Sequence, residues 1–221
     1  MAGSSSKQVV YFLSGLGVDE RAFVKIRLPE NFEMRFIRWI EPKTKEPFDA
    51  YCLRLAEQID TSVPVILAGL SFGGMTAVNL SRLIPARQII LLSSIPLSAE
   101  LPRLYRFLAF FRLHQLTPAA VIKKASWFSY WLFGMKTAEE KKLLREILAD
   151  IPEKFLYWAT ATAISWRNTD KPEHLFHIHG SNDHVLYASR THPDRIIEGA
   201  GHFMVFTHAE EVNRFLEEAL T

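Results

Sequence analysis

Residues Val63 to Met75, V-P-V-I-L-A-G-L-S-F-G-G-M, decide how this chain folds. A short apolar run ends in G-L-S-F-G at positions 69–73, and apolar residues at helical spacing follow directly. This order predicts a strand, a very sharp turn and a helix. Such a turn strains the serine backbone, so the residues two before and two after it must be small, as Gly69 and Gly73 are. We interpret Ser71 as a nucleophile whose hydroxyl stands above the sheet edge.

The pattern G-x-S-x-G also arises by chance, so its setting between a strand and a helix carries the interpretation. The same turn would aim the backbone N–H of Phe72 and the start of the new helix at whatever Ser71 attacks. A nucleophilic serine also needs a base, an orienting carboxylate and a second N–H donor for the developing negative charge.

Length and composition favour one compact domain. With 221 residues and 48% hydrophobic content, the chain can bury a large core. A net charge of +2 is too small to indicate a nucleic acid or an anionic membrane as the main partner. The single Cys52 excludes an internal disulfide and a cysteine metal site, and it lies where a small core residue is expected.

Positions 1–7 are short, small and polar, without the apolar stretch of a signal peptide, so we expect a cytoplasmic protein. The longest aromatic run, Trp127 to Met135, is much shorter than the roughly 20 residues of a spanning helix. We therefore expect no insertion into a membrane.

The chain alternates between strand and helix patterns, which indicates a mostly parallel sheet of about six strands covered on both faces. Helices are expected from near Asp19, an N-cap residue, over 48–59, and from Thr207 with a capping box to Glu210. The expected strands are 8–13, 33–40, 63–68, 87–93, 174–179 and 195–198.

The pattern changes between residues 96 and 167, where apolar residues recur at helical spacing and no strand run occurs. We interpret 96–167 as a helical cap inserted into a core formed by 1–95 and 168–221. Thr137 and Glu140 form a capping box that predicts a helix to about Asp150. Pro102, Pro118 and Pro152 fit the starts of further cap helices.

Large aromatic residues in the cap favour an apolar or acyl substrate over a sugar or a free amino acid. They include Trp127, Tyr130, Trp131, Phe133 and Trp158. The basic residues of the cap are best explained as a solvated face, and docking of a phosphopantetheine carrier or coenzyme A is the alternative.

Two further residues follow strand patterns at the same predicted sheet edge as Ser71. Asp183 lies in a turn after 174–179, and His202 lies in a loop of small residues after 195–198. His184 is a weaker candidate base, and Asp194 and Glu198 are weaker candidate carboxylates because neither lies in such a turn.

The segments G-L-S-F-G-G, H-G-S-N-D and G-A-G-H-F carry Ser71, Asp183 and His202 in that order and resemble the catalytic segments of the α/β-hydrolase superfamily. The resemblance covers essentially the whole chain and implies a small, capped, esterase-like serine hydrolase. It implies that Ser71 is the nucleophile, His202 the general base and then acid, and Asp183 the carboxylate that orients His202. Phe72 and Leu16 would supply the oxyanion N–H groups.

The sequence departs from the superfamily in three places, one of which is the short spacing from Asp183 to His202, which leaves little room for the usual intervening helix. Ser14 stands where a histidine usually precedes the glycine of the oxyanion loop, and the first strands of the usual sheet are missing. The loop 14–17 is explained equally well, by itself, as an ordinary tight turn. No metal or organic cofactor is expected.

The expected reaction is hydrolysis of a small-molecule ester through an acyl-enzyme. A thioesterase, a lactonase or a methyl esterase acting on a carrier-bound acyl chain would use the same three residues, and haloperoxidases and C–C bond hydrolases share the architecture. A hypothesis from another class is a receptor that binds a small apolar ligand and does not turn it over.

His177 and His179 alternate along one predicted strand, so their side chains share a face. Such a pair can ligate a metal, but a third ligand is needed and no clear one is present. We therefore expect packed or hydrogen-bonded strand histidines.

Overall fold

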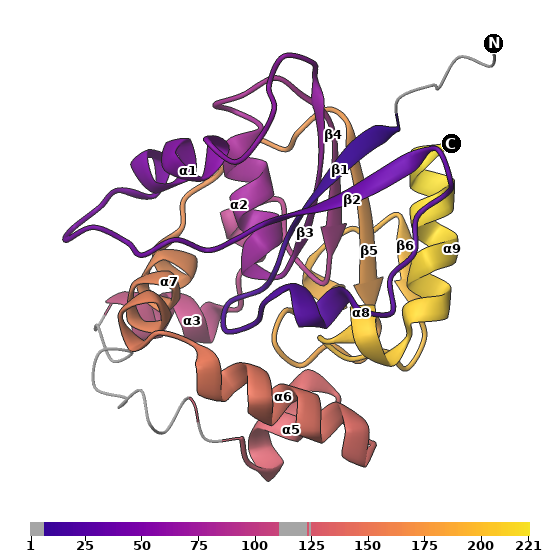
Figure 1. Cartoon of the computed structure of the whole chain (residues 1–221). Coiled ribbons are helices and arrows are strands. Elements are labelled where there is room, and N and C mark those ends of the chain that lie inside the picture. Colours follow the sequence, from indigo (N-terminus) through magenta and orange to yellow (C-terminus); the bar gives the residue numbers. More distant parts are fainter. Residues whose placement is uncertain (1–6, 111–122, 124) are drawn as a thin grey trace.

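The computed structural model describes residues 7–110, 123 and 125–221. Within them the chain forms a six-stranded parallel sheet in the order β2-β1-β3-β4-β5-β6 (Figure 1). The strands are β1 (Gln8–Leu13), β2 (Phe32–Ile37), β3 (Val65–Leu70), β4 (Ala86–Leu92), β5 (Leu175–Gly180) and β6 (Arg195–Ile197). The expected parallel sheet of about six strands is confirmed.

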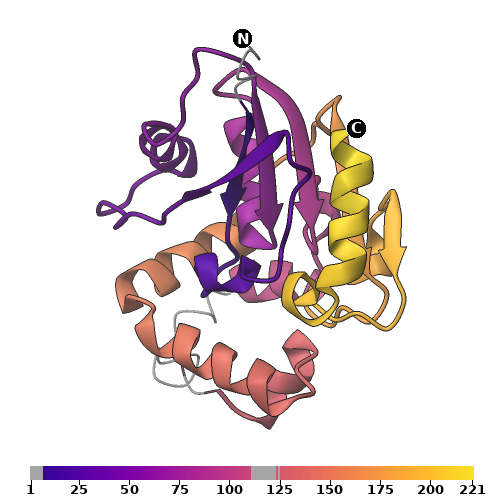
Figure 2. The same ribbon diagram turned by 45° about the vertical axis from the view of Figure 1, so that its right-hand side comes forward.

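Helices cover both faces of the sheet. α2 packs against β1, β3 and β4 with α1 beside it, and α9 packs against β5 and β6 on the opposite face (Figure 2). The helices of these layers are α1 (Phe48–Ala56), α2 (Phe72–Leu80), α8 (Met204–Thr207) and α9 (Ala209–Leu220). Two faces covered by helices are what a parallel sheet with near-continuous apolar strands requires.

The strand order reverses between β1 and β3. The chain leaves β1 for β2 on one side and then returns to β3 on the other side, so the carboxyl ends of β1 and β3 are neighbours. Loops that leave such neighbours in opposite directions open a crevice at the sheet edge. Ser71 and the loop 14–17 both lie at this crevice.

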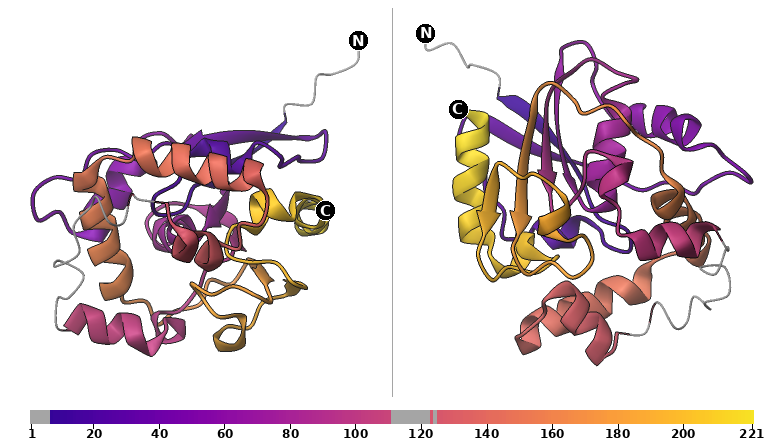
Figure 3. Two further views of the ribbon diagram at one scale, coloured as in Figure 1. Left: turned by 90° about the horizontal axis from the view of Figure 1, so that it is seen from below. Right: turned by 180° about the vertical axis from the view of Figure 1, so that it is seen from behind.

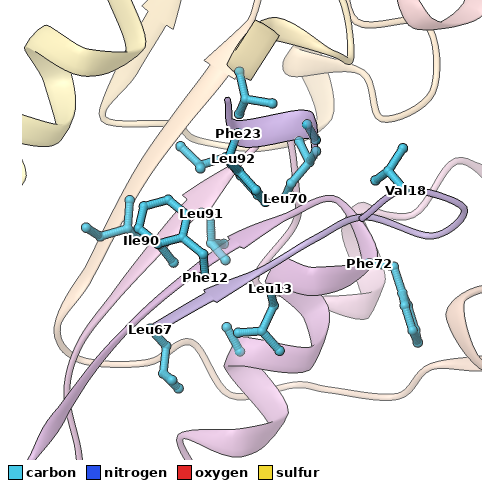
Figure 4. Packing of buried hydrophobic residues seen from close by; sticks show 14 of the residues in the cluster. Phe12, Leu13, Val18, Phe23, Leu67, Leu70, Phe72, Ile90, Leu91 and Leu92 are labelled. Carbon is cyan, nitrogen blue, oxygen red and sulfur yellow. The ribbon is translucent and has the colours of Figure 1, made fainter. Parts of the chain in front are cut away.

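The core consists of the central strands and the residues packed on them (Figure 4). Phe12, Leu67 and Ile90 come from three adjacent strands and are fully buried, and Phe12 meets Phe23 edge-to-face at 5.1 Å. Burying one such side chain contributes about 1.5–3 kcal/mol, so this cluster holds the strand ends rigidly. Cys52 is also fully buried, as expected, and its burial raises the pKa of the thiol to about 12.

β2 ends at Ile37, three residues earlier than the sequence pattern predicts, because its partner strand β1 ends there. Ile37 pairs with Leu13, the last residue of β1, so the residues after Ile37 have no strand beside them. Side chains of α1 and its following turn satisfy their backbone instead. The Tyr51 hydroxyl donates to Ile40 O at 2.8 Å, and Gln58 Nε2 donates to Arg38 O at 2.9 Å.

The predicted capping box of Thr207 and Glu210 is wrong. Thr207 is the last residue of the short helix α8, and its hydroxyl donates back to Phe203 O at 3.3 Å. The N-cap of α9 is His208, whose side chain makes no capping hydrogen bond. The threonine that the pattern assigns to the N-cap of α9 is instead part of the preceding helix α8.

The described residues between β4 and β5 form helices at the carboxyl edge of the sheet, where Figures 1 and 3 place them. The capping box of Thr137 and Glu140 is confirmed, and Pro102 and Pro152 immediately precede helices. Pro118 lies outside the described residues. The helices of this segment are α3 (Arg103–Phe110), α5 (Trp127–Phe133), α6 (Ala138–Asp150) and α7 (Glu153–Ser165).

The end of α5 lies against the loop that carries His202. Gly134 ends α5 in the left-handed conformation, with φ 76°, and a Cβ there would lie 2.9 Å from Gly201 Cα. The backbone N–H of Phe203 donates to Phe133 O at 3.2 Å across the same contact. Two glycines therefore allow the backbones of α5 and of the His202 loop to touch.

We predict that Gly134→Ala destabilises the fold more than Gly199→Ala, the matched control. Both glycines have nearly the same positive φ, 76° and 75°, but nothing lies within 4 Å of a Cβ at Gly199. The control should lose about 1–2 kcal/mol from backbone strain, and Gly134→Ala should lose at least about 1 kcal/mol more from overpacking. Urea unfolding measures both, and equal losses would contradict the close contact.

Candidate active site

Ser71 lies in a strained turn between β3 and α2. Its φ of 52° and ψ of −116° are outside the regions that non-glycine residues normally adopt. A Cβ at Gly69 would lie 2.3 Å from Gly73 O, and a Cβ at Gly73 would lie 2.3 Å from both Leu13 O and Ser14 O. The small residues that the sequence predicts around Ser71 are therefore required by backbone contacts on both sides.

Hydrogen bonds hold the strained serine from its backbone. The N–H of Ser71 donates to Leu92 O at 3.0 Å, which continues the β3–β4 ladder by one residue. The Ser94 hydroxyl donates to Ser71 O at 2.6 Å and is fully buried. Strain of about 1–3 kcal/mol persists only where the surroundings impose it, and these bonds do so.

Two backbone N–H groups close to Ser71 in sequence or in space, those of Phe72 and Leu16, have no acceptor among the described residues. Ser14 donates its hydroxyl to Val18 O at 2.8 Å and so closes the loop after β1. In the part of the chain that the structure describes, neither the Leu16 N–H nor the Phe72 N–H donates a hydrogen bond. Both residues line the same cavity as Ser71.

Asp183 lies in the turn after β5, as predicted. Its Oδ1 accepts the backbone N–H groups of Val185 at 2.8 Å and of Leu186 at 2.9 Å. These bonds fix the carboxylate from one side and leave Oδ2 directed at His202. The residue is only 3% exposed.

His202 joins the other two predicted residues. Its Nδ1 lies 2.7 Å from Asp183 Oδ2, and its Nε2 lies 2.8 Å from Ser71 Oγ. Because the carboxylate accepts only, Nδ1 carries the proton and Nε2 of the neutral ring accepts from the serine hydroxyl. This arrangement can remove the serine proton and stabilise the imidazolium that results.

The Asp183 carboxyl stays ionised although it is buried. Burial by itself would raise the pKa of Asp183, but the charge of His202 and contacts with His179 and His202 outweigh burial and hold the pKa well below its usual range. A carboxylate is therefore available to His202 over the whole neutral range.

His179 is a neighbour of Asp183 that sequence reasoning missed. Its Nε2 lies 3.3 Å from Asp183 Oδ2, and its Nδ1 lies 3.1 Å from Nε2 of His177. The prediction of packed, hydrogen-bonded strand histidines is confirmed, since both rings are buried. The contact depends on the fold of the turn after β5, so the sequence offered no signal for it.

The weaker candidates make other contacts. His184 stacks on Trp131 of α5, with ring centroids 4.2 Å apart. Asp194 accepts the backbone N–H of His177 at 2.8 Å, and Glu198 is exposed.

Ser71 and His202 open onto a cavity of about 320 Å³. The described residues that line it include no Lys, Arg, Asp or Glu, and most of them are aliphatic or aromatic. Leu132 and Phe133 come from α5, Thr160 and Ala163 from α7, and Tyr105 from α3. Burial raises the pKa of Tyr105 to about 12, so its hydroxyl stays protonated.

A larger cavity of about 440 Å³ lies beyond the loop after β1, between the end of β2 and helices α6 and α7. Ser71 and His202 do not line it. Its charged residues are already in ion pairs: Arg21 with Asp19 and Asp150, Arg38 with Glu20, and Glu41 with Lys154. We therefore assign the chemistry to the smaller cavity.

Among the described residues, no group of three or more His, Cys, Asp or Glu side chains is arranged to hold a metal ion. The helices in this part of the chain are also too short or too polar to cross a bilayer.

Comparisons with known proteins agree with this geometry. The model of the alpha/beta hydrolase family matches residues 15–215. A bromoperoxidase from Bacillus anthracis superimposes with a TM-score of 0.70 at 16% identity, over 97% of this chain and 92% of that chain. No curated protein matches the sequence.

Two other solved structures show the same fold. A thermophilic esterase from Thermogutta terrifontis has a TM-score of 0.66 at 17% identity, over 97% of this chain and 90% of that chain. MenH from S. aureus has a TM-score of 0.66 at 18% identity, over 100% and 97%.

We predict that His177 makes folding stability depend on pH. Burial, the main cause, lowers the pKa of His177 to about 3 from an ordinary 6.5, so the unfolded chain binds a proton that the folded chain does not. Stability should therefore fall by up to about 1.4 kcal/mol per unit as the pH drops through that window. His177→Gln, which keeps a donor toward His179, should lack this component in urea titrations. Parallel curves for both proteins would refute the prediction.

Proposed function

Because the chain belongs to the alpha/beta hydrolase family, we propose that it cleaves carboxylic esters of small, largely apolar acyl groups through an acyl-enzyme on Ser71. The observation that carries the proposal is the unbroken chain of short contacts from Ser71 through His202 to Asp183, beside a cavity whose described lining residues include no Lys, Arg, Asp or Glu.

In the first half of the proposed reaction, Ser71 Oγ attacks the ester carbonyl while His202 Nε2 takes its proton. The carbonyl oxygen becomes an oxyanion, and the N–H groups of Phe72 and Leu16 donate to it. Neither N–H group has an acceptor in the described part of the chain, which supports this role, because a preorganised donor needs no rearrangement in the transition state. His202 then gives the proton to the leaving alcohol.

In the second half, water replaces the alcohol. His202 takes a proton from the water as it attacks the acyl-enzyme, and the proton returns to Ser71 when the carboxylic acid leaves. Asp183 holds the ring in one tautomer throughout. None of these steps uses a metal or an organic cofactor.

We assign residues 96–167 as a cap that sets the acyl group, because α3, α5 and α7 supply much of the cavity lining. Thr160 turns its hydroxyl back to Leu156 O at 2.7 Å, which leaves its methyl group for the cavity. Apolar walls favour an acyl chain without charge. Thioesters of an acyl carrier or of coenzyme A, and lactones, are alternative substrates whose acyl groups would contact the same cavity residues.

We predict that wild-type protein hydrolyses p-nitrophenyl esters with repeated turnover and that Ser71→Ala and His202→Ala lower kcat by up to about a millionfold. The matched controls are Ser62→Ala and His174→Ala, which change exposed residues away from the cavity and should keep full activity.

Steady-state kinetics and labelling by a fluorophosphonate probe measure both effects. A single covalent event without turnover would favour the receptor hypothesis. Undiminished activity of Ser71→Ala would refute the mechanism.

We predict that Ala163→Phe shifts the preferred acyl chain toward shorter esters. Ala163 lines the cavity from α7, and a phenyl ring there would fill part of the 320 Å³. Ala161 lies on the same helix but does not line the cavity, so Ala161→Phe should leave the preferred acyl chain length unchanged. The readout is kcat/KM across a chain-length series, and an unchanged optimum in Ala163→Phe would exclude α7 from the acyl site.

A further inference from the structure

We propose that His179 is a positioning residue for the reaction: its Nε2–H, fixed on Leu186 O, is held beside Asp183 Oδ2 and keeps that oxygen directed at His202. This inference rests on the proposed function, because it assigns His179 to the same three-residue machinery without placing it in contact with substrate.

The hydrogen bonds fix the tautomer of His179. Nε2 lies 2.7 Å from Leu186 O, a carbonyl that only accepts, so Nε2 carries a proton. The Nδ1 atom of a neutral ring then accepts, and Nε2 of His177 lies 3.1 Å away as the donor. The N–H of His179 is thus presented to the Asp183 side and cannot move to the other nitrogen without breaking two contacts.

His177 holds the His179 ring from the side opposite Asp183, through its contact with His179 Nδ1. Burial lowers the pKa of its ring to about 3, so it is neutral, and the Thr191 hydroxyl lies 3.4 Å from its Nδ1. A neutral ring that donates from Nε2 accepts at Nδ1, which matches the threonine. His177 and His179 therefore form one line of ring contacts that ends at Asp183.

With the contact from His179, both oxygens of the Asp183 carboxylate have two nitrogen neighbours each. Oδ1 accepts the N–H groups of Val185 and Leu186, and Oδ2 meets His202 at 2.7 Å and His179 at 3.3 Å. Leu186 contacts both side chains, since its N–H donates to Asp183 and its C=O accepts from His179. The ring and the carboxylate are consequently positioned by the same turn.

Other titratable groups near Asp183 and His179 set the background for any pH effect. Besides His202 and His177, these are Tyr105 of α3, which interacts with Asp183, and Glu100 of the 3₁₀ helix Ser98–Glu100, which interacts with His179. Burial raises the pKa values of Tyr105 and Glu100. Variants must therefore be compared with wild type at every pH and not at a single value.

Three substitutions at one position test the proposal. His179→Gln can place its amide N–H where Nε2 lies, His179→Asn places its amide near Nδ1 instead, and His179→Phe fills the volume without a donor. We expect kcat/KM for a p-nitrophenyl ester to fall about 10–100-fold in the Asn and Phe variants and to recover in His179→Gln. KM should change little, because His179 does not line the cavity.

The pH profile separates positioning from a structural role. Without the N–H of His179, more negative charge remains on Asp183 Oδ2, which stabilises the imidazolium form of His202. The acid limb of kcat/KM should then move to higher pH in the Asn and Phe variants only. Equal losses in all three variants, no loss in any, or an unmoved acid limb would overturn the proposal. If His179→Phe does not fold, the Gln and Asn pair decides.

A readout that needs no substrate keeps this proposal distinct from the proposed function. The proton between His202 Nδ1 and Asp183 should give a far-downfield NMR resonance that is retained in His179→Gln and shifted or lost in His179→Asn. If wild type neither turns over esters nor reacts with a fluorophosphonate, the proposed function fails and the resonance still decides on His179. An unchanged resonance in His179→Asn refutes the positioning role.

Discussion

The structure depends on backbone packing at the carboxyl ends of β1 and β3, where no side chain fits. Gly73 touches the carbonyls of Leu13 and Ser14, and Gly69 touches the backbone of Gly73. This packing forces Ser71 into a positive φ and brings the loop after β1 beside the start of α2. The apolar burial of the central strands offsets the strain. Catalytic geometry is here a consequence of how tightly two strand ends and a helix meet.

The second constraint is electrostatic, because a buried carboxylate is stable only with enough donors. Asp183 finds them on its own turn, on β5 and on the loop after β6. Each donor comes from a segment fixed by the sheet register, in which Gly180 pairs with Ile197. Contacts from these segments lower the pKa of Asp183, so the ionised carboxylate depends on the alignment of all three.

Local rules in the sequence were sufficient to find Ser71, Asp183 and His202, because strand ends, glycines and small-residue loops are short-range signals. The end of β2 was not predictable, since it depends on the length of β1, a strand at a distance in the sequence. The predicted cap at Thr207 failed because Thr207 is the last residue of α8, so that His208 takes the N-cap position of α9. The contact of His179 with Asp183 requires the fold of a turn, which residue types alone do not define.

Helix α5 couples the cavity beside Ser71 to the proposed catalytic residues in a way that α7 does not. Phe133 lines the cavity, accepts a backbone hydrogen bond from Phe203 and lies with its ring 5.8 Å from that of His202. A change of shape at α5 is therefore transmitted to the base, so selectivity and rate must change together there. Ala163 on α7 lines the cavity away from these contacts, and selectivity can be altered there while the His202 loop keeps its position.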